Sequence, residues 1–200
     1  MTGQDKHFTD LLTQSIYAAV HYLAEHQLPN GEFLTYIAPD DKMLQWCVPD
    51  SNTFIPALIG NCLTPLEAAF PEITAMLDKT DAFLQYQMMR GGVWHFFSRW
   101  HPQFKYLPPD TDDTVTISTY FRKRKKQHFD NTAMLLANRT KKGLFYTWYT
   151  LHPTFTRYPR VYWRLILREL KYPVHTLLYW IKGDHSRNDV DAIVNANAIY

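Results

Sequence analysis

Cysteine is scarce in this sequence, which has only Cys47 and Cys62 among its 200 residues. Two cysteines cannot build the disulfide framework of a small secreted domain, and their spacing fits no zinc-binding pattern. We therefore expect two reduced thiols buried in the core.

Long apolar segments are also missing. The longest, Val174 to Ile181, is interrupted by His175 and Thr176 and is too short to cross a bilayer. The first six residues, Met-Thr-Gly-Gln-Asp-Lys, lack the apolar stretch of a signal peptide. We therefore expect a cytoplasmic protein.

A strong net charge is absent as well. The 21 Lys and Arg residues and 19 Asp and Glu residues give a net charge of +2 at pH 7. This balance provides no general attraction to nucleic acid, so we expect no nucleic-acid partner. The basic run from Arg122 to Lys126 is predicted to be a solvated loop. A basic stripe could bring a helix to a membrane surface as a peripheral contact; its residues are Arg157, Arg160, Arg164, Arg168 and Lys171.

Hydrophobic residues are plentiful, at 46%, and 200 residues suffice for one domain with a core. Apolar spacing, capping residues and prolines predict an all-α chain. Helices are expected at residues 9–26, 54–63, 71–87, 131–137 and 192–200, at 158–181 with a break near Pro173, and from residue 110 or 111 onward. Thr64 to Glu67 reads as a capping box. Gly143 to Thr150 has the composition of a strand, so one small β-hairpin is expected there.

The chain shows signs of an internal repeat at a spacing of sixty residues. Four pairs are related by this shift: Gln27 and Gln87, Gly31 and Gly91, Pro49 and Pro109, Asp50 and Asp110. A third helix entry of the same kind lies at 188–191. The pattern predicts stacked helical hairpins in a single domain. Since the last apolar run has no stop signal, we expect a chain that is cut short, or a final helix completed by a partner in a homo-oligomer.

The most informative stretch is Pro108 to Thr114, in which Asp110, Asp112 and Asp113 fall within four positions. Two prolines hold the approach extended, so Asp110 or Thr111 can cap a helix. Three crowded carboxylates cannot all ionise cheaply, so one could stay protonated and act as an acid if burial outweighs the helix dipole. The alternative is that these acids only complement the helix dipole.

An aromatic-rich loop precedes the acids. Aromatic faces tolerate a carbocation without attacking it, which is what an acid that protonates alkenes would need around it. We select four of these residues as candidate substrate contacts: Trp94, Phe97, Trp100 and Tyr106. The alternative is that they form the core beneath a long loop. His95 and His101 could orient an acid or bind a metal, although a structural role is more common for such residues.

The segment Asp110-Thr111-Asp112-Asp113-Thr114 resembles the D-x-D-D-T motif of class II terpene cyclases, the family that includes squalene–hopene cyclases. Gln27 to Phe33 resembles the family's Gln-x-x-x-Gly-x-Trp repeat with Phe for Trp, and Gln87 to Trp94 matches it with one added residue. The resemblance covers about residues 8 to 125.

The resemblance implies an α/α toroid and an isomerase that protonates an isoprenoid alkene. Asp112 would be the proton donor, and Asp110 and Asp113 would hold its orientation and protonation. It implies an isoprenoid small molecule as partner and no cofactor or metal ligands, with Mg²⁺ needed only if the substrate carries a diphosphate.

Known cyclases of this class span several hundred residues, and a full toroid needs about twice the helical hairpins seen here. We therefore expect a partial toroid over residues 1–200. Two alternatives share this fold: a carbohydrate-active hydrolase or lyase with two catalytic carboxylates, and a non-catalytic relative. A protein prenyltransferase subunit is disfavoured, because no Asp-x-Cys is followed by a histidine that could complete a zinc site.

Overall fold

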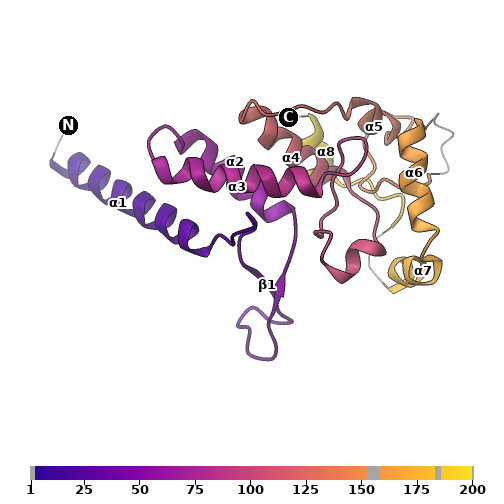
Figure 1. Ribbon diagram of the computed structural model, residues 1–200, viewed down its shortest axis with the longest axis horizontal. Coiled ribbons are helices and arrows are strands. Elements are labelled where there is room, and N and C mark those ends of the chain that lie inside the picture. The colour runs from indigo at the N-terminus through magenta and orange to yellow at the C-terminus, as the bar shows by residue number, and fades with distance from the viewer. Residues whose placement is uncertain (1–2, 153–157, 183–185, 200) are drawn as a thin grey trace.

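The computed structural model describes residues 3–152, 158–182 and 186–199. The chain is mostly helical and carries one small antiparallel sheet of two strands (Figure 1). The helices are α1 (Gly3–His26), α2 (Phe54–Leu63), α3 (Pro71–Gln87), α4 (Thr111–Lys123), α5 (Thr132–Ala137), α6 (Arg160–Glu169), α7 (Pro173–Lys182) and α8 (Ala192–Ile199). The strands are β1 (Thr35–Ile37) and β2 (Val48–Asp50), and the short 3-10 helices are η1 (Thr64–Leu66) and η2 (Pro102–Lys105).

Most of the predicted helices are confirmed to within a few residues. Proline at the first position starts α3 at Pro71, and the expected break near Pro173 separates α6 from α7. The first helix is longer than predicted, because α1 already begins at Gly3 and Thr9 lies inside it. The capping box is wrong: Thr64 Oγ1 donates to the Gly60 carbonyl at 2.7 Å rather than accepting an N–H of a helix start, and Glu67 bonds Arg124 instead.

The β-hairpin is present, but at a different place from the one predicted. Strands β1 and β2 pair antiparallel, with Thr35 opposite Asp50. Residues 143–150 form only isolated bridges, because their backbone is used to hold the start of α4. Tyr149 N–H donates to the Pro109 carbonyl at 3.0 Å, and the Thr147 carbonyl accepts from Thr111 N–H at 2.8 Å.

One five-residue turn occurs three times, at 28–32, 89–93 and 140–144. In each, the first N–H donates to the fifth carbonyl, at 2.7, 2.9 and 2.7 Å respectively. The fourth residue is always a glycine with positive φ: 96° at Gly31, 67° at Gly92 and 87° at Gly143. Glycine adopts this backbone conformation without the strain that a side chain would impose. These three glycines therefore mark equivalent positions.

Three helices, α2, α4 and α8, also begin in the same way. The side-chain Oδ1 of Asn52, of Asp110 and of Asp191 accepts the N–H three residues later, at 2.9, 2.8 and 3.1 Å respectively. Each side chain thus caps the start of a helix, namely α2, α4 and α8, although in α2 the residue directly before the helix is Thr53. The chain therefore contains three units, α1 with α2, α3 with α4, and α5 with α8. Helices α6 and α7 lie within the loop of the third unit.

The expected shift of sixty residues is wrong. The repeated unit nevertheless has the predicted order of helix, glycine turn, loop and second helix. At the turn, Gly31 corresponds to Gly92 rather than to Gly91. At the cap, Asn52 corresponds to Asp110, while Asp50 ends strand β2. The two loops between turn and cap differ in length, so no single shift aligns both ends of the unit.

Adjacent units are joined by a repeated pair of hydrogen bonds, which we call the clip: the N–H and the Oγ1 of one threonine each donate to a backbone carbonyl of the next unit. Thr53 N–H donates to the Phe96 carbonyl and its Oγ1 to the His95 carbonyl, both at 2.7 Å. Thr111 makes the same two bonds in the next unit, to the carbonyls of Thr147 and Tyr146, both at 2.8 Å. As a result α4 packs between α2 and α8, and residues from the first turns of these three helices lie close together.

The core has two parts. The larger is formed mainly by α2, α3 and α4, with only the second half of α1 packed against it, and the smaller by α5, α6 and Tyr149. The cysteine prediction is wrong, because Cys47 and Cys62 are both exposed. Cys47 lies in the connection between the two strands, and Cys62 lies on the outer face of α2.

Candidate active site

The acid cluster lies at the first turn of α4. Asp110 is the N-cap, with an extended φ of −126°, and its Oδ1 accepts Asp113 N–H at 2.8 Å. Thr114 Oγ1 donates to the Asp110 carbonyl at 2.7 Å and accepts Trp94 N–H at 3.1 Å. The helix start is therefore fixed from both sides.

Two of the three acids are buried. Asp113 is 1% exposed and Asp110 is 6% exposed. Burial, with the nearby charge of Asp110, raises the pKa of Asp113 well above its usual range. Burial also raises the pKa of Asp110, to about 6, although hydrogen bonds from Asp113 work in the opposite direction. Burial therefore favours a protonated form of the pair.

The hydrogen bonding of Asp113 agrees with this protonation. Its Oδ2 is buried and accepts no hydrogen bond from any described residue. A buried carboxylate oxygen without a donor is costly, whereas a protonated oxygen needs an acceptor. Asp110 is within hydrogen-bonding reach of the Asp113 carboxyl group and can accept that proton. We call these two residues the acid pair.

Asp112, the donor implied by the family resemblance, is placed differently. It is half-buried, and its Oδ1 accepts a hydrogen bond at 2.8 Å from Asn197 Nδ2, on α8. Among the described residues, the Asp112 side chain makes no hydrogen bond to Asp110 or Asp113. The orienting role predicted for those two residues therefore has no direct contact to support it.

An open pocket of about 200 Å³ lies beside the three acids. Besides Asp110, Asp112 and Asp113, it is lined by Phe54, Phe96, Thr147 and Val194. These four residues come from the start of α2, from the segments after the second and third turns, and from α8. The clips between units bring them together, so nothing in the local sequence around the acids identifies them. The phenyl rings of Phe54 and Phe96 lie with centroids 6.5 Å apart.

The four aromatic residues predicted to contact substrate do not meet at this pocket. Trp94 is buried in the larger core, where its Nε1 donates to the Leu84 carbonyl at 2.8 Å. Phe97 stacks on His101, with ring centroids 4.0 Å apart. Their role as substrate contacts stays a prediction, which the described pockets do not support.

Of the other two predicted aromatics, Trp100 is exposed and Tyr106 is half-buried. Trp100 is 54% exposed and stacks on Tyr86, with centroids 5.6 Å apart. Tyr106 stacks on His175 of α7 at 4.5 Å. The aromatic residue of this loop that does line the pocket is Phe96, which is not among the four predicted substrate contacts.

The two histidines of this loop have structural partners. His95 is buried, its Nδ1 accepts Phe97 N–H at 2.9 Å, and its Nε2 therefore carries the hydrogen that is donated to the Leu107 carbonyl at 3.0 Å. Burial, with the charge of Arg168, lowers the pKa of His95 to about 3, so it is neutral. His101 Nε2 lies 3.7 Å from Asp50 Oδ1, and burial lowers the pKa of His101.

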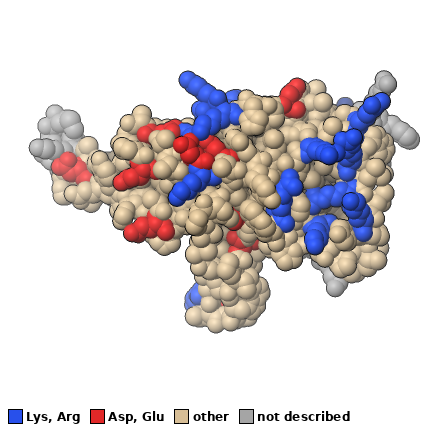
Figure 2. All heavy atoms as spheres, viewed as in Figure 1, with Lys and Arg blue, Asp and Glu red and all other residues tan. Residues whose placement is uncertain are grey.

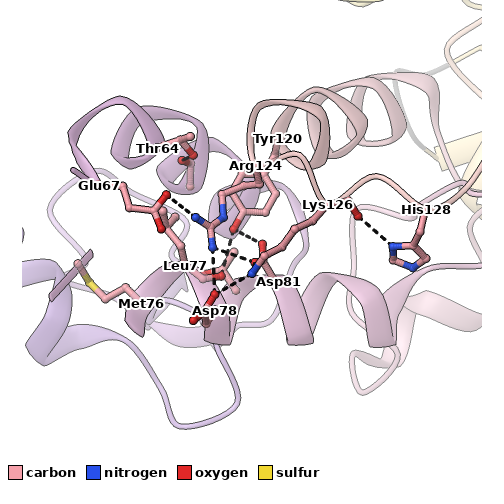
Figure 3. A network of polar contacts seen from close by, with 12 residues as sticks. Thr64, Glu67, Met76, Leu77, Asp78, Asp81, Tyr120, Arg124, Lys126 and His128 are labelled. Carbon is pink, nitrogen blue, oxygen red and sulfur yellow. Dashed lines mark hydrogen bonds and ion pairs between the residues drawn. The ribbon is translucent and has the colours of Figure 1, made fainter. Parts of the chain in front are cut away.

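A second group of acids lies beside the C-terminal end of α4 (Figure 3). These acids belong to α3 and to the residue after η1. Arg124 bonds Asp81 Oδ2 at 3.1 Å and Asp78 Oδ1 at 3.0 Å, and it also pairs with Glu67. Lys126 Nζ bonds the same oxygens of Asp81 and Asp78, at 2.7 and 2.8 Å. The prediction that the run from Arg122 to Lys126 is simply solvated is therefore wrong for these two cations.

The charged groups at this end shift the pKa values of their neighbours. The hydrogen bond from Lys126 lowers the pKa of Asp78. Burial, with a hydrogen bond to Asp81, raises the pKa of Tyr120, whose hydroxyl donates to Asp81 Oδ1 at 2.6 Å. This end of α4 is thus an ion-pair network that joins α4 to α3.

Among the described side chains, no group of three or more His, Cys, Asp or Glu residues is arranged to hold a metal ion. No described helix is both long and apolar enough to cross a membrane. Comparisons with protein-family models, with curated proteins and with solved structures found no match for this chain.

Proposed function

We propose that the protein is a class II terpene cyclase-like isomerase that protonates an isoprenoid alkene, with the proton held by the acid pair. The observation that carries this proposal is the buried Asp113 carboxyl group, with its raised pKa, beside a pocket that also has two aromatic rings. Protonating an alkene requires an acid that keeps its proton at neutral pH and is shielded from water.

The reaction would begin with transfer of the Asp113 proton to one carbon of a C=C bond. The π electrons form the new C–H bond and leave a tertiary carbocation, while Asp113 becomes a carboxylate. A second alkene of the same molecule then attacks the cation and closes a ring, and loss of a proton ends the sequence. Phe54 and Phe96 would each stabilise a nearby cation by roughly 0.5–2 kcal/mol.

The proposal changes the donor that the resemblance implies. Asp112 is half-buried and already has Asn197 as a partner, whereas Asp113 is buried and its pKa is raised. The pocket, at about 200 Å³, is smaller than the roughly 300–1,000 Å³ that buries a drug-sized ligand. It therefore has room for the reacting end of an isoprenoid chain, and the rest of the chain would extend outward.

A sugar-active enzyme is less well supported. Two glycosidase carboxyl groups flank the bond that is cleaved and lie about 5 Å or more apart. Asp110 and Asp113 instead contact one another, which leaves no room for a glycosidic oxygen between them. The non-catalytic relative remains the alternative that the experiment below has to exclude.

We also propose that the three units are part of an α/α toroid. The support is the recurrence of one turn, one cap and one clip, with the inner helices α2, α4 and α8 side by side. In such an arrangement the helix starts face a common centre, which is where the acid pair lies.

Solvent deuterium tests the proposed chemistry. The protein is incubated in D₂O with squalene and, separately, with geranylgeranyl diphosphate with and without Mg²⁺, and the products are analysed by mass spectrometry. A cyclic product should carry one deuterium from the initiating acid. The Asp113→Asn variant should lower the rate by roughly 10²–10⁴-fold, as expected for loss of a general acid.

The matched control is Asp130→Asn, because Asp130 is an exposed acid outside the pocket. It should leave the rate unchanged. Equal rates for Asp113→Asn and the unmodified protein would contradict the donor assignment. The absence of any deuterated cyclic product from both substrates would contradict the enzymatic function and favour the non-catalytic alternative.

A further inference from the structure

A second and larger pocket, of about 700 Å³, lies between the end of α3, the loop after it and helix α6. Its lining is half basic and half apolar. The basic residues are Arg90, Arg99, Arg164, Arg168 and Lys171, and the apolar ones are Met88, Met89, Phe104, Leu165 and Leu167. The residues of the acid pair are not among them.

Two of the arginines are held in place by the protein. Arg168 lies over the Phe104 ring, with its guanidinium carbon 4.1 Å from the ring centroid, and donates to the Phe104 carbonyl and toward Met89 Sδ. Arg99 Nη2 donates to the Met88 carbonyl at 2.9 Å. A guanidinium has five N–H donors, so this one bond leaves Arg99 with donors for an anion.

The other three cations, Arg90, Arg164 and Lys171, are exposed and form no ion pair with a described side chain. None of the ten lining residues of this pocket is acidic. Figure 2 shows Lys and Arg gathered over the end of the molecule that holds α6, whereas most of the visible Asp and Glu lie over the other half. Five cations around one cavity repel one another, and a bound anion would remove that repulsion.

We propose that this pocket binds the phosphate or diphosphate group of an organic phosphate that carries an apolar chain. Arginine forks match phosphate oxygens in geometry and charge, and the two fixed arginines lose little freedom on binding. The apolar half of the lining would contact the chain, and the volume is within the usual range for ligand pockets. The ligand is either a free organic phosphate or the headgroup of an anionic lipid. The proposal does not depend on the acid pair.

The test compares two double variants with equal loss of charge. Arg90→Gln with Arg164→Gln removes two exposed cations of the pocket, and Lys141→Gln with Lys142→Gln removes two exposed cations elsewhere. Calorimetry measures binding of inorganic pyrophosphate. Co-sedimentation measures binding to vesicles of phosphatidylcholine alone and of phosphatidylcholine with one fifth phosphatidylglycerol. Circular dichroism checks that both variants are folded.

The pocket variant should bind at least about tenfold more weakly than the unmodified protein, because two charge-assisted contacts are lost. The control variant should bind like the unmodified protein. Loss of pyrophosphate binding in the pocket variant identifies a free organic phosphate as the ligand, and loss of binding only to the anionic vesicles identifies a lipid headgroup. Equal weakening in both variants, or no binding to either probe, would overturn the proposal.

Discussion

The two ends of helix α4 carry carboxyl groups that are buried to the same degree but lie among different charges. At the start, Asp113 is 1% exposed, and the hydrogen-bonded group nearest to it is another acid, Asp110. At the end, Asp81 is 3% exposed and is bonded by Arg124 and Lys126. Two aspartates that are almost equally buried thus differ in whether a cation lies beside them.

The two ends should also respond to pH in opposite directions. A carboxyl group whose pKa is raised on folding stabilises the fold below its unfolded pKa, and this contribution is lost as the pH rises through the folded pKa. A carboxyl group whose pKa is lowered, such as Asp78, stabilises the fold above its unfolded pKa and loses this contribution on acidification. The start of α4 thus favours low pH and its end favours neutral pH.

The largest expected effect comes from removing the cation at the end of α4. Arg124→Gln leaves the buried Asp81 without its guanidinium partner, and its own side chain is only 5% exposed. We expect a loss of about 3–5 kcal/mol in the free energy of unfolding. Arg122→Gln, an exposed residue on the same helix, is the control and should change stability by less than about 0.5 kcal/mol. Urea denaturation at pH 7 measures both, and equal losses would contradict the ion-pair account.

The next effect is the pH dependence that the acid pair adds to stability. Asp110 has an ordinary pKa of about 3.9 when unfolded and about 6 in the folded protein. The free energy of unfolding of the unmodified protein should therefore fall by at least about 3 kcal/mol, relative to a variant without the pair, between roughly pH 4 and pH 6, because the raised pKa of Asp113 adds to the contribution of Asp110. The variant Asp110→Asn with Asp113→Asn provides that reference. A constant difference between the two proteins across this range would show that the pair is not protonated.

A second acid pair could be built at the equivalent cap of α2. Asn52 Nδ2 donates to Asp50 Oδ2 at 2.8 Å and its Oδ1 accepts the Ile55 N–H. Asn52→Asp keeps the cap but replaces the donor by a carboxylate, so two acids would face one another. We expect a loss of about 1–3 kcal/mol at pH 7, part of which returns at pH 5 as the new carboxyl group is protonated. Denaturation at the two pH values measures this, and Asn52→Ser is the uncharged control. The same loss at both pH values would contradict the expected repulsion between Asp50 and the new carboxylate.

The smallest effect should come from Asp112, which lies between the members of the acid pair in sequence but outside it in space. It is a half-buried acid in a first helical turn, so Asp112→Asn should cost only about 0.3–1 kcal/mol through the lost interaction with the helix dipole. Asp113→Asn should not lower stability at pH 7 and should raise it, because the amide removes a carboxyl group that ionises readily in the unfolded chain but not in the fold. Thermal unfolding near pH 7 compares the two. The reverse order would favour Asp112 as the crowded acid.

Local features of the sequence predicted the helices well, because caps and prolines act within a few residues. Pro71 begins α3 and Asp110 caps α4, as the sequence indicates. The hairpin was misplaced because the strand-like residues 143–150 pair with the backbone before α4 rather than with one another. The repeat was recognised in the wrong register, because loops of unequal length separate Gly31 from Asn52 and Gly92 from Asp110.

The acid cluster could be found in the sequence, but its surroundings could not. The neighbours Phe54, Phe96 and Val194 reach the pocket through contacts between units. Which of three adjacent aspartates is buried depends on the direction of each side chain on the helix, and the basic run after α4 gave no sign that Arg124 reaches back to α3. These are consequences of tertiary packing, and spacing along the chain does not determine them.

The central claim is that the acid pair holds a proton at neutral pH, and a carboxyl titration tests it most directly. The side-chain carbons of aspartate are labelled with ¹³C and followed by NMR from pH 3 to pH 8, with single Asp→Asn variants to assign Asp110 and Asp113. The account predicts that Asp110 titrates near pH 6 and that Asp113 titrates well above its ordinary range. Titration of both groups near the ordinary value of about 3.9 would contradict it.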